Sequence, residues 1–522
     1  MLRTVRILGK RSWVPAGKSI LLSCVSALLL VLSFPPYNCE FLAWLAFVPF
    51  FLALENSSKT QALVSAYISG VVFWLGTVYW LVHVTLAGML VIVLYLALYW
   101  GVFGFVISWQ GVFRRRTSVF FIPAMWVLLE YCRGYALTGF PWSLLAYSQS
   151  QTLAVIQFAD ITGAWGVSFV VMMANAAIYI VLKNIRHGHS GMKAPVVVAC
   201  CLLLCVYLYG VFRLHPPDRV SGAPGGHIKI SVVQGNIPQE LKWDRYAQDY
   251  IIQRYSALSQ GAAGDAPDLI VWPEAAVPVI LGQGSAYLGS LQEFVNARRV
   301  NLLAGAVTSR NTMFYNSAVL LQPGAGAEIY DKIHLVPFGE YIPLRQVFGF
   351  LETIVPIGEA QKGTDYHVFR PDPLNNAPGY AFSALICYED VFPELSRRMV
   401  NKGAQFLVTV TNDAWYQRTA APYQHFQSSV FRAVENRVWM VRSANTGVSG
   451  FIRPDGSVEG LVQDSAGNTI FVGGYLTRDI EIRTRPHTVY TRLGDWFVAA
   501  ALFIFLLCSL KIRVFPGALR HR

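Results

Sequence analysis

Three residues whose side chains can perform nucleophilic catalysis each follow a predicted β-strand. They are Glu274 in a Val-Trp-Pro-Glu run, Lys332 in Tyr-Asp-Lys, and Cys387, which ends an apolar run at residues 380–386. A thiolate is a nucleophile, a carboxylate can take and return its proton, and an ammonium stabilises an oxyanion. Because strand ends at one edge of a sheet can meet in space, the three residues predict a catalytic site.

Each of these residues also has a structural explanation when it is taken alone. Free cysteine often packs as a small buried hydrophobe, and single Glu or Lys residues are mostly surface charges. Cys387 is the only one of the 8 cysteines between residues 214 and 495, so it has no disulfide partner there. No CxxC or Cys/His spacing typical of a metal site occurs.

The composition indicates a membrane protein. Of 522 residues, 54% are hydrophobic and only 14% are charged, against about 25% charged in soluble domains. The net charge of +12 does not indicate nucleic-acid binding, because the basic residues lie beside apolar runs and no basic-aromatic motif occurs. We predict eight membrane spans, of which the second and fifth are short enough to be re-entrant or buried. They lie at residues 20–34, 41–54, 62–84, 86–107, 118–129, 165–182, 194–211 and 496–510.

The distribution of Lys and Arg predicts the orientation of these spans. The N-terminus, residues 114–116, residues 183–193 and the C-terminal tail are all basic, and basic loops stay on the cytoplasmic side. Both termini are therefore expected in the cytoplasm, with the first span kept as an anchor. A seven-span arrangement would break this pattern.

Three regions are predicted: a bundle of about seven transmembrane helices at 1–213, a mixed α/β domain at 214–494, and a last helix with a basic tail at 495–522. The middle region alternates strand-like runs with helical periodicity. Strands are expected at 228–233, 269–272, 302–307, 316–321, 380–386, 406–411 and 438–443. Helices are expected at 245–258, 287–299, 392–401 and 423–437.

Longer motifs surround the three candidate residues. They are WPE at 272–274, DK at 331–332 with HLVPFGEY at 334–341, and ICYE at 386–389. Further runs are QGN at 234–236 with Trp243, TGFPW at 138–142, TNDAW at 411–415, QH at 424–425 and NTG at 445–447. The first set resembles the three motifs of the nitrilase superfamily, and the second resembles its membrane-embedded branch, the apolipoprotein N-acyltransferases. The resemblance extends over nearly the whole chain.

The resemblance implies an α/β fold: a nitrilase-like αββα sandwich inserted before the last helix of a bundle of about eight transmembrane helices. It implies a multi-pass protein of a bacterial inner membrane, with the catalytic domain in the periplasm. The implied partners are a phospholipid acyl donor, an apolipoprotein acceptor and membrane lipid, without nucleic acid. We expect a monomer.

The resemblance also implies roles. Glu274 is the general base and acid, Lys332 stabilises the oxyanion, and Cys387 is the nucleophile. Three further residues support the site: Glu340, Tyr388 and Glu389. The implied reaction moves an acyl chain from a phospholipid, through a Cys387 thioester, to the N-terminal amine of the diacylglyceryl-cysteine of an apolipoprotein. It implies no metal, nucleotide or other cofactor.

Other positions are candidates for substrate binding. Trp243 and Trp415 belong to motifs of the family, and Glu130 and Arg133 are polar residues at the end of a predicted span. The pair is equally explained as an interfacial ion pair. The apolar stretch at 347–357 is either core or a lid that enters the bilayer. The sequence departs from the family at Trp-Tyr-Gln 415–417 and Ala-Pro 421–422, where Trp-Phe-Gly and Gly-Pro are expected.

Two other functions are compatible with parts of the pattern. A membrane-anchored amidase would use the same three residues with water as acceptor, but one anchor would suffice for it. A transporter or receptor with an outer ligand-binding domain would place ionisable residues deep within the spans, and the spans contain few. The many spans therefore favour the acyltransferase.

Overall fold

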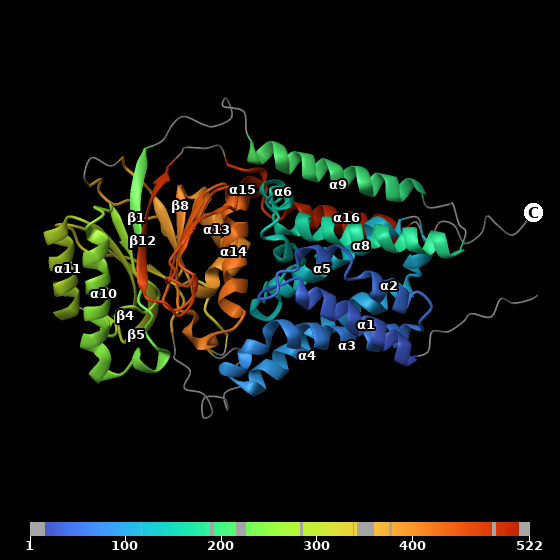
Figure 1. Cartoon of the computed structure of the whole chain (residues 1–522), viewed down its shortest axis with the longest axis horizontal. Coiled ribbons are helices and arrows are strands. Elements are labelled where there is room, and N and C mark those ends of the chain that lie inside the picture. The colour runs from blue at the N-terminus through green and yellow to red at the C-terminus, as the bar shows by residue number, and fades with distance from the viewer. Residues whose placement is uncertain are drawn as a thin grey trace, which may run out of the picture. The chain divides into compact units, whose positions relative to one another are not determined.

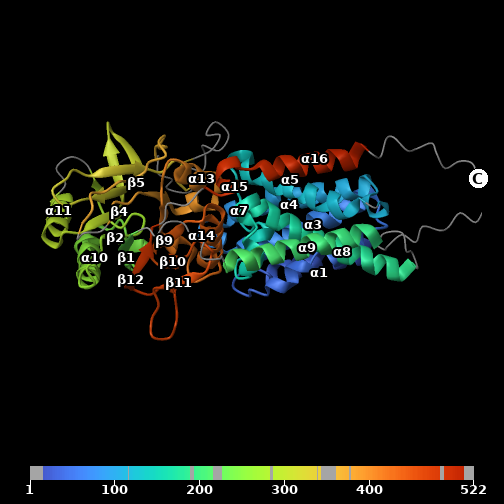
Figure 2. The same cartoon turned by 90° about the horizontal axis from the view of Figure 1, so that it is seen from above.

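The computed structural model describes residues 16–115, 117–187, 193–215, 226–281, 286–337, 339–341, 360–374, 378–482 and 487–510. The chain divides into two compact units (Figures 1 and 2). The first contains residues 1–133, 168–205 and 498–522, and the second contains residues 134–167 and 206–497. The predicted stretch 347–357 lies outside the described residues.

The first unit is helical. Its helices are α1 (Ala16–Leu32), α2 (Val48–Leu54), α3 (Lys59–Val78), α4 (Leu86–Trp109), α5 (Ser118–Tyr135), and parts of α8 (Ala164–His187), α9 (Lys193–Leu214) and α16 (Trp496–Leu510). Helices α3 and α4 pack closely because small residues face each other: a Cβ added at Gly104 would lie 2.4 Å from the Cβ of Ala66. Close approach through small residues is typical of helices packed in membranes.

Four helical stretches are long and apolar enough to cross a membrane by length and composition: Lys59–His83, Leu86–Trp109, Ala164–Arg186 and Ala194–Leu214. The predicted spans at 20–34, 41–54 and 496–510 fall on the shorter apolar helices Ala16–Leu32, Glu40–Leu54 and Trp496–Leu510. The second of these is broken into a 3₁₀ turn, Glu40–Trp44, and α2, which has only 7 residues. The total of eight spans stays a prediction.

The second unit is an αββα sandwich. In the described part of the chain, one sheet has the order β12-β1-β2-β4-β5-β6, with β3 beside β4, and the other has the order β11-β10-β9-β8-β7. Figure 1 shows α10 (Gln248–Ala263) and α11 (Ala286–Arg298) on one outer face, with α13 (Pro393–Asn401) and α14 (Ala421–Asn436) on the other. Ser443 joins the sheets, because its hydroxyl lies within hydrogen-bonding distance of the carbonyl oxygens of Val233 (2.9 Å) and Val271 (3.1 Å).

The strands of the first sheet are β1 (His227–Gln234), β2 (Leu269–Val271), β3 (Ile280–Leu281), β4 (Asn301–Arg310), β5 (Met313–Leu321), β6 (Glu328–Asp331) and β12 (Gly474–Glu481). Those of the second sheet are β7 (Phe382–Ile386), β8 (Phe406–Thr411), β9 (Trp439–Ala444), β10 (Gly450–Ile452) and β11 (Val458–Leu461). Strands β1, β2 and β4 are parallel, as are β7, β8 and β9. Their residues are almost all buried, as parallel strands between two layers require.

Residues 134–167 belong to this second unit although they lie between predicted spans. Two of their short elements, η5 (Leu145–Gln149) and α7 (Ala159–Thr162), contact α14. The main-chain N–H of Ala164 donates to Glu435 on α14, at 3.0 Å. Helix α14 is consequently buried on nearly all its faces. The predicted boundary at residue 213 stays a proposal, and the compact unit reaches back to residue 134.

Candidate active site

Glu274, Lys332 and Cys387 follow three different strands. Glu274 follows β2, Lys332 follows β6, and Cys387 follows β7. Because β5 is antiparallel to both β4 and β6, β6 runs in the same direction as β2 and β4. The carboxyl ends of β2 and β6 therefore lie at the same edge of the first sheet. Cys387 follows β7 of the second sheet, so the expectation that all three residues share one sheet edge was wrong. All three side chains are at least nine-tenths buried.

Glu274 is held through its main chain and its carboxylate. Gly305 on β4 is in contact with the main chain of Glu274, and a Cβ there would lie 2.5 Å from the Glu274 Cα. The buried ammonium of Lys242 donates to the main-chain oxygens of Glu274 (2.8 Å) and Ala275 (3.2 Å). The side-chain amide of Asn316 donates to Glu274 Oε1 at 2.7 Å. The carboxylate therefore has a fixed orientation.

Lys332 is paired with two carboxylates. Its Nζ lies 2.9 Å from Glu340 and 3.6 Å from Glu274 Oε1. Asn316 also donates to Glu340 Oε1, at 2.8 Å, and so links the two acids. Burial opposes the charge on Lys332, but Glu340 and Glu274 outweigh it and raise the pKa of the ammonium. Lys332 is consequently a permanent cation at neutral pH.

Cys387 adopts a left-handed backbone conformation, with φ of 52°, which costs a non-glycine residue roughly 1–3 kcal/mol. Burial raises the pKa of its thiol, and the charge of Glu274 raises it further. The ammonium of Lys332 and a hydrogen bond from Thr411 lower it. The thiol is thus protonated at rest, and a base is needed to generate the nucleophile.

Glu389 joins the chain around Cys387 to the chain that follows Lys332. Its carboxylate accepts hydrogen bonds from the main-chain N–H groups of Ile386 (2.7 Å), Ile333 (2.6 Å) and His334 (3.0 Å). The Tyr330 hydroxyl lies 2.9 Å from both carboxylate oxygens. Burial raises the pKa of Glu389 to about 7, although the N–H groups of Ile386 and His334 lower it. Glu389 therefore acts as a brace between two strand ends.

Tyr388 lies against the TGFPW motif. Its hydroxyl donates to the main-chain oxygen of Gly139 at 3.2 Å. Its ring stacks on Trp142 with a centroid distance of 6.3 Å and packs edge-to-face against Phe392. The motif at 138–142 thus belongs to the same compact unit as the candidate site and lies next to a predicted supporting residue.

The other predicted positions lie differently. Trp243 and Trp415 are about half exposed, at 50% and 51%, so their rings are open to a ligand. Glu130 and Arg133 lie on α5 in the helical unit, where both are buried and the Arg133 guanidinium stacks over Trp74 at 4.8 Å. Roles in substrate binding stay predictions for all four.

Two residues of the site were not predicted from the sequence: Lys242 and Asn316. Lys242 directly precedes Trp243, and Asn316 begins a predicted strand, so both lay beside predicted features. Their functional groups come from elements that meet the strand ends only in the folded chain. Within the described residues, no group of three or more His, Cys, Asp and Glu side chains could hold a metal ion.

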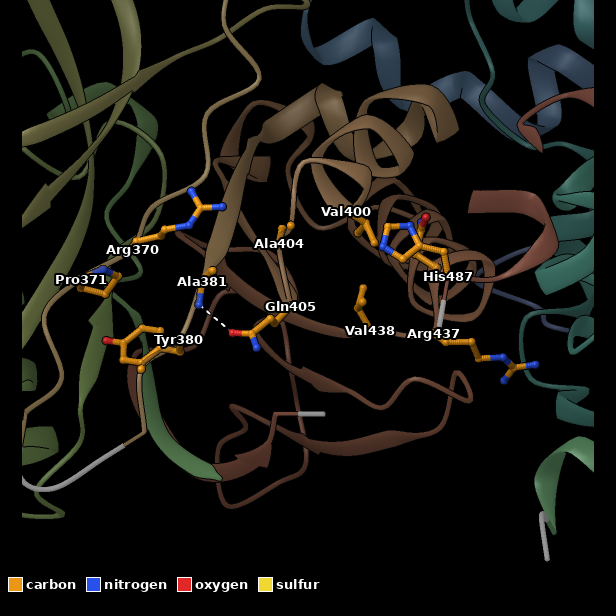
Figure 3. Close-up of a pocket in the computed structure, with 13 residues that line it drawn as sticks. Arg370, Pro371, Tyr380, Ala381, Val400, Ala404, Gln405, Arg437, Val438 and His487 are labelled. Carbon is orange, nitrogen blue, oxygen red and sulfur yellow. Dashed lines mark hydrogen bonds between the residues drawn. The ribbon is translucent and has the colours of Figure 1, made fainter. Parts of the chain in front are cut away.

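The second unit also contains a cavity of about 480 Å³ between β7 and the ends of α13 and α14 (Figure 3). The predicted site residues are not among those that line it. The guanidinium of Arg437 binds Asp160, and that of Arg370 bonds to the main-chain oxygens of Val368 and Lys402. The two guanidinium groups of the lining are therefore already bonded to other groups of the protein.

The strand ends thus bring together a protonated thiol, a fixed carboxylate and a buried ammonium. The carboxylate can move a proton, and the ammonium can stabilise an oxyanion formed when the sulfur attacks a carbonyl carbon. This is the chemistry of a hydrolase or acyltransferase that works through a covalent thioester.

Comparison with known proteins gives the family. Residues 229–473 match the carbon-nitrogen hydrolase family, and residues 26–177 match the apolipoprotein N-acyltransferase N-terminal domain. The chain is 35% identical to the apolipoprotein N-acyltransferase of Geobacter metallireducens, over 93% of each chain. It is 32% identical to that of Bradyrhizobium diazoefficiens, over 77% of this chain and 74% of the relative. The crystal structure of Saccharomyces cerevisiae Nit3 aligns at 17% identity with a TM-score of 0.38, covering 50% of this chain and 93% of that chain.

The αββα unit is therefore a carbon-nitrogen hydrolase domain of the nitrilase superfamily. The chain as a whole belongs to the apolipoprotein N-acyltransferase family, and it is an acyltransferase with apolar helices typical of a membrane protein.

Proposed function

We propose that this enzyme transfers a fatty acyl chain from a phospholipid, through a thioester on Cys387, to the N-terminal amine of an apolipoprotein's diacylglyceryl-cysteine. The observation that carries the proposal is the buried contact of Lys332 with Glu274 and Glu340, with Lys332 and Glu274 close enough to the Cys387 thiol to shift its pKa. This arrangement supplies a base, a nucleophile and an oxyanion partner in one dry site, where electrostatic stabilisation is strong.

In the first half-reaction, Glu274 takes the proton of the Cys387 thiol. The sulfur then attacks the ester carbonyl of the phospholipid, and Lys332 stabilises the tetrahedral oxyanion. The C–O bond breaks as Glu274 gives its proton to the departing alkoxide. A lysophospholipid leaves, and the acyl chain stays on Cys387 as a thioester.

In the second half-reaction, the neutral amine of the acceptor attacks the thioester carbonyl. Glu274 takes a proton from the attacking nitrogen, and Lys332 again stabilises the oxyanion. The C–S bond breaks, the proton returns to the sulfur, and an amide is formed. The amine is a better nucleophile than water, and the buried site, at least nine-tenths covered at all three side chains, disfavours hydrolysis.

The proposal includes the membrane arrangement. The protein would lie in a bacterial inner membrane with both termini in the cytoplasm and residues 214–494 in the periplasm, because the basic loops alternate in that sense. Reporter fusions at residue 188 should then show a cytoplasmic location and fusions at residue 265 a periplasmic one. The reverse pattern would refute this orientation.

The thioester is the decisive test of the mechanism. The purified protein should be incubated with phosphatidylethanolamine without acceptor, and the peptide that contains Cys387 examined by mass spectrometry. We expect the mass of one acyl chain on Cys387 in the wild type and none in Cys387→Ala. An unmodified peptide with accumulating free fatty acid would instead indicate a hydrolase that uses water as acceptor.

A further inference from the structure

Four buried charged side chains form a cluster that contacts the main chain of Cys387. They are Asp390, Asp413, His425 and Arg442, which we call the charge quartet. The Arg442 guanidinium lies 2.5 Å from Asp390 and 3.4 Å from Asp413, and all three side chains are 0% exposed. His425, 2% exposed, lies between the same two carboxylates. With a proton on His425, the quartet has no net charge, which limits the cost of burying it.

The neighbours of His425 require both of its ring nitrogens to carry a proton. Nδ1 lies 2.9 Å from Asp413 Oδ1. Nε2 lies 2.8 Å from Asp390 Oδ1 and 3.2 Å from the main-chain oxygen of Cys387. All three partners are acceptors, and a neutral imidazole has only one N–H. Burial opposes the charge, but Asp390 and Asp413 outweigh it and raise the pKa of His425 to about 9.

The main chain of Cys387 is held on both sides. The carboxylate of Glu389 accepts a hydrogen bond from the N–H of Ile386, the residue before Cys387, at 2.7 Å. On the other side, Nε2 of His425 lies 3.2 Å from the carbonyl oxygen of Cys387. A non-glycine residue keeps a left-handed conformation only where its surroundings impose it. We propose that the charge quartet positions the nucleophile: protonated His425 holds the Cys387 carbonyl and so keeps the thiol turned toward Glu274 and Lys332. This inference rests on the proposed role of Cys387.

Sequence motifs outside those of Glu274, Lys332 and Cys387 converge on the quartet. Asp413 comes from the TNDAW run, and a Cβ at Gly447 of the NTG run would lie 2.1 Å from Asp413 Oδ2. Trp142 of the TGFPW run covers His425 at a ring-centroid distance of 5.5 Å and donates from Nε1 to Gln424, at 2.8 Å. The ring shields the quartet from water, so its electrostatic interactions are strong.

The elements packed around His425 supply a defined set of charges. They are Asp390 after β7, Asp413 after β8 and Arg442 on β9; Ser429 on its own helix and Trp142 are neutral. Beyond the Cys387 carbonyl lies the thiol, on which the charges of Glu274, Lys332 and Asp413 act. Asp390 is the carboxylate that raises the pKa of His425 most, so its removal is the sharpest perturbation.

The first test measures the rate of Cys387 acylation in single turnovers with phosphatidylethanolamine in detergent micelles. We expect His425→Gln to lower this rate about 100-fold, as a misplaced nucleophile does, while the phospholipid concentration for half-maximal rate stays within about twofold. The matched control is His367→Gln, because His367 also pairs with a carboxylate, Glu328 at 2.7 Å, but lies outside the site. This control should acylate at the wild-type rate. Wild-type acylation by folded His425→Gln would overturn the inference.

A pH profile separates positioning from a loss of folded protein. The wild-type acylation rate should fall as pH rises through about 9, where His425 loses its proton. In Asp390→Asn the pKa of His425 is lower, so the falling limb should move to lower pH by about one unit or more. The inference would be overturned if the acylation rate of Asp390→Asn fell at the same pH as that of the wild type. It would also be overturned if the wild-type rate stayed constant up to pH 10. Turnover by Cys387→Ala would instead refute the proposed function itself.

Discussion

Lys242 donates a hydrogen bond from its buried ammonium to the main-chain oxygen of Glu274, 2.8 Å away. A second bond goes to Ala275, whose φ is 46°. Burial lowers the pKa of Lys242 to about 8, although the charge of Glu274 raises it. The loop that carries the proposed base is therefore held by a residue 32 positions earlier in the chain.

Replacing Lys242 should misplace Glu274. In Lys242→Met, two carbonyl oxygens lose their donor, which costs about 1–3 kcal/mol for each group left unsatisfied. We expect acylation of Cys387 to slow roughly 10- to 100-fold and the thermal unfolding midpoint to fall. Lys229→Met is the control, because Lys229 also donates to a main-chain oxygen, that of Asp265, but does so at the surface. Equal acylation rates in the two variants would contradict this role.

Glu274→Gln should change two reactions of Cys387 in opposite directions. The negative charge of Glu274 raises the pKa of the thiol, so its removal should make alkylation by iodoacetamide at pH 8 faster. Acylation by phospholipid should become roughly 10²- to 10⁴-fold slower, because the general base is lost. Alkylation and acylation rates on the same preparation test this, with exposed Glu293→Gln on α11 as control.

Lys332→Met should slow both reactions. The ammonium lowers the pKa of the Cys387 thiol, so its loss leaves less thiolate for iodoacetamide and no partner for the oxyanion. Faster alkylation in Lys332→Met would mean that its charge does not act on the thiol.

Removing the brace at Glu389 should destabilise the α/β unit. Glu389→Ala leaves three main-chain N–H groups and the Tyr330 hydroxyl without their acceptor, at about 1–3 kcal/mol each. We expect a large fall in the thermal unfolding midpoint. Glu389→Gln keeps one carbonyl oxygen as acceptor, so its thermal unfolding midpoint should fall less. Identical midpoints for Glu389→Ala and the wild type would contradict the brace.

The stabilising effect of His425 should depend on pH. Its folded pKa, about 9, lies above the ordinary value of 6.5, so its charge contributes stability fully below pH 6.5. That contribution is lost as pH rises through 9, and it is on the order of 3 kcal/mol. The gap in unfolding midpoint between the wild type and His425→Gln should be widest below pH 6.5 and narrow toward pH 9. A gap that widens with pH would contradict a charged His425.

Local sequence patterns predicted most of the α/β unit. The expected strands at 228–233, 269–272 and 406–411 correspond to β1, β2 and β8, and the helix at 392–401 corresponds to α13. These segments carry their own hydrophobic periodicity, so each is recognisable without its neighbours. Strand β12 was not predicted, because its side chains are mostly half-exposed and polar and it becomes a strand by pairing along β1.

The chemistry of the site was predictable for the same local reason: a carboxylate, an ammonium and a thiol each follow an apolar run, within motifs of one family. What the sequence could not determine is which groups hold them. Three contacts join segments far apart in the chain. Lys242 bonds to the main chain of Glu274, Asn316 bonds to two carboxylates, and His425 contacts the carbonyl of Cys387. Such contacts are fixed by the register in which the strands pair and by the packing of the helices and loops on the sheets. The sequence alone therefore determined the proposed reacting groups, and the tertiary structure decided how they are oriented and charged.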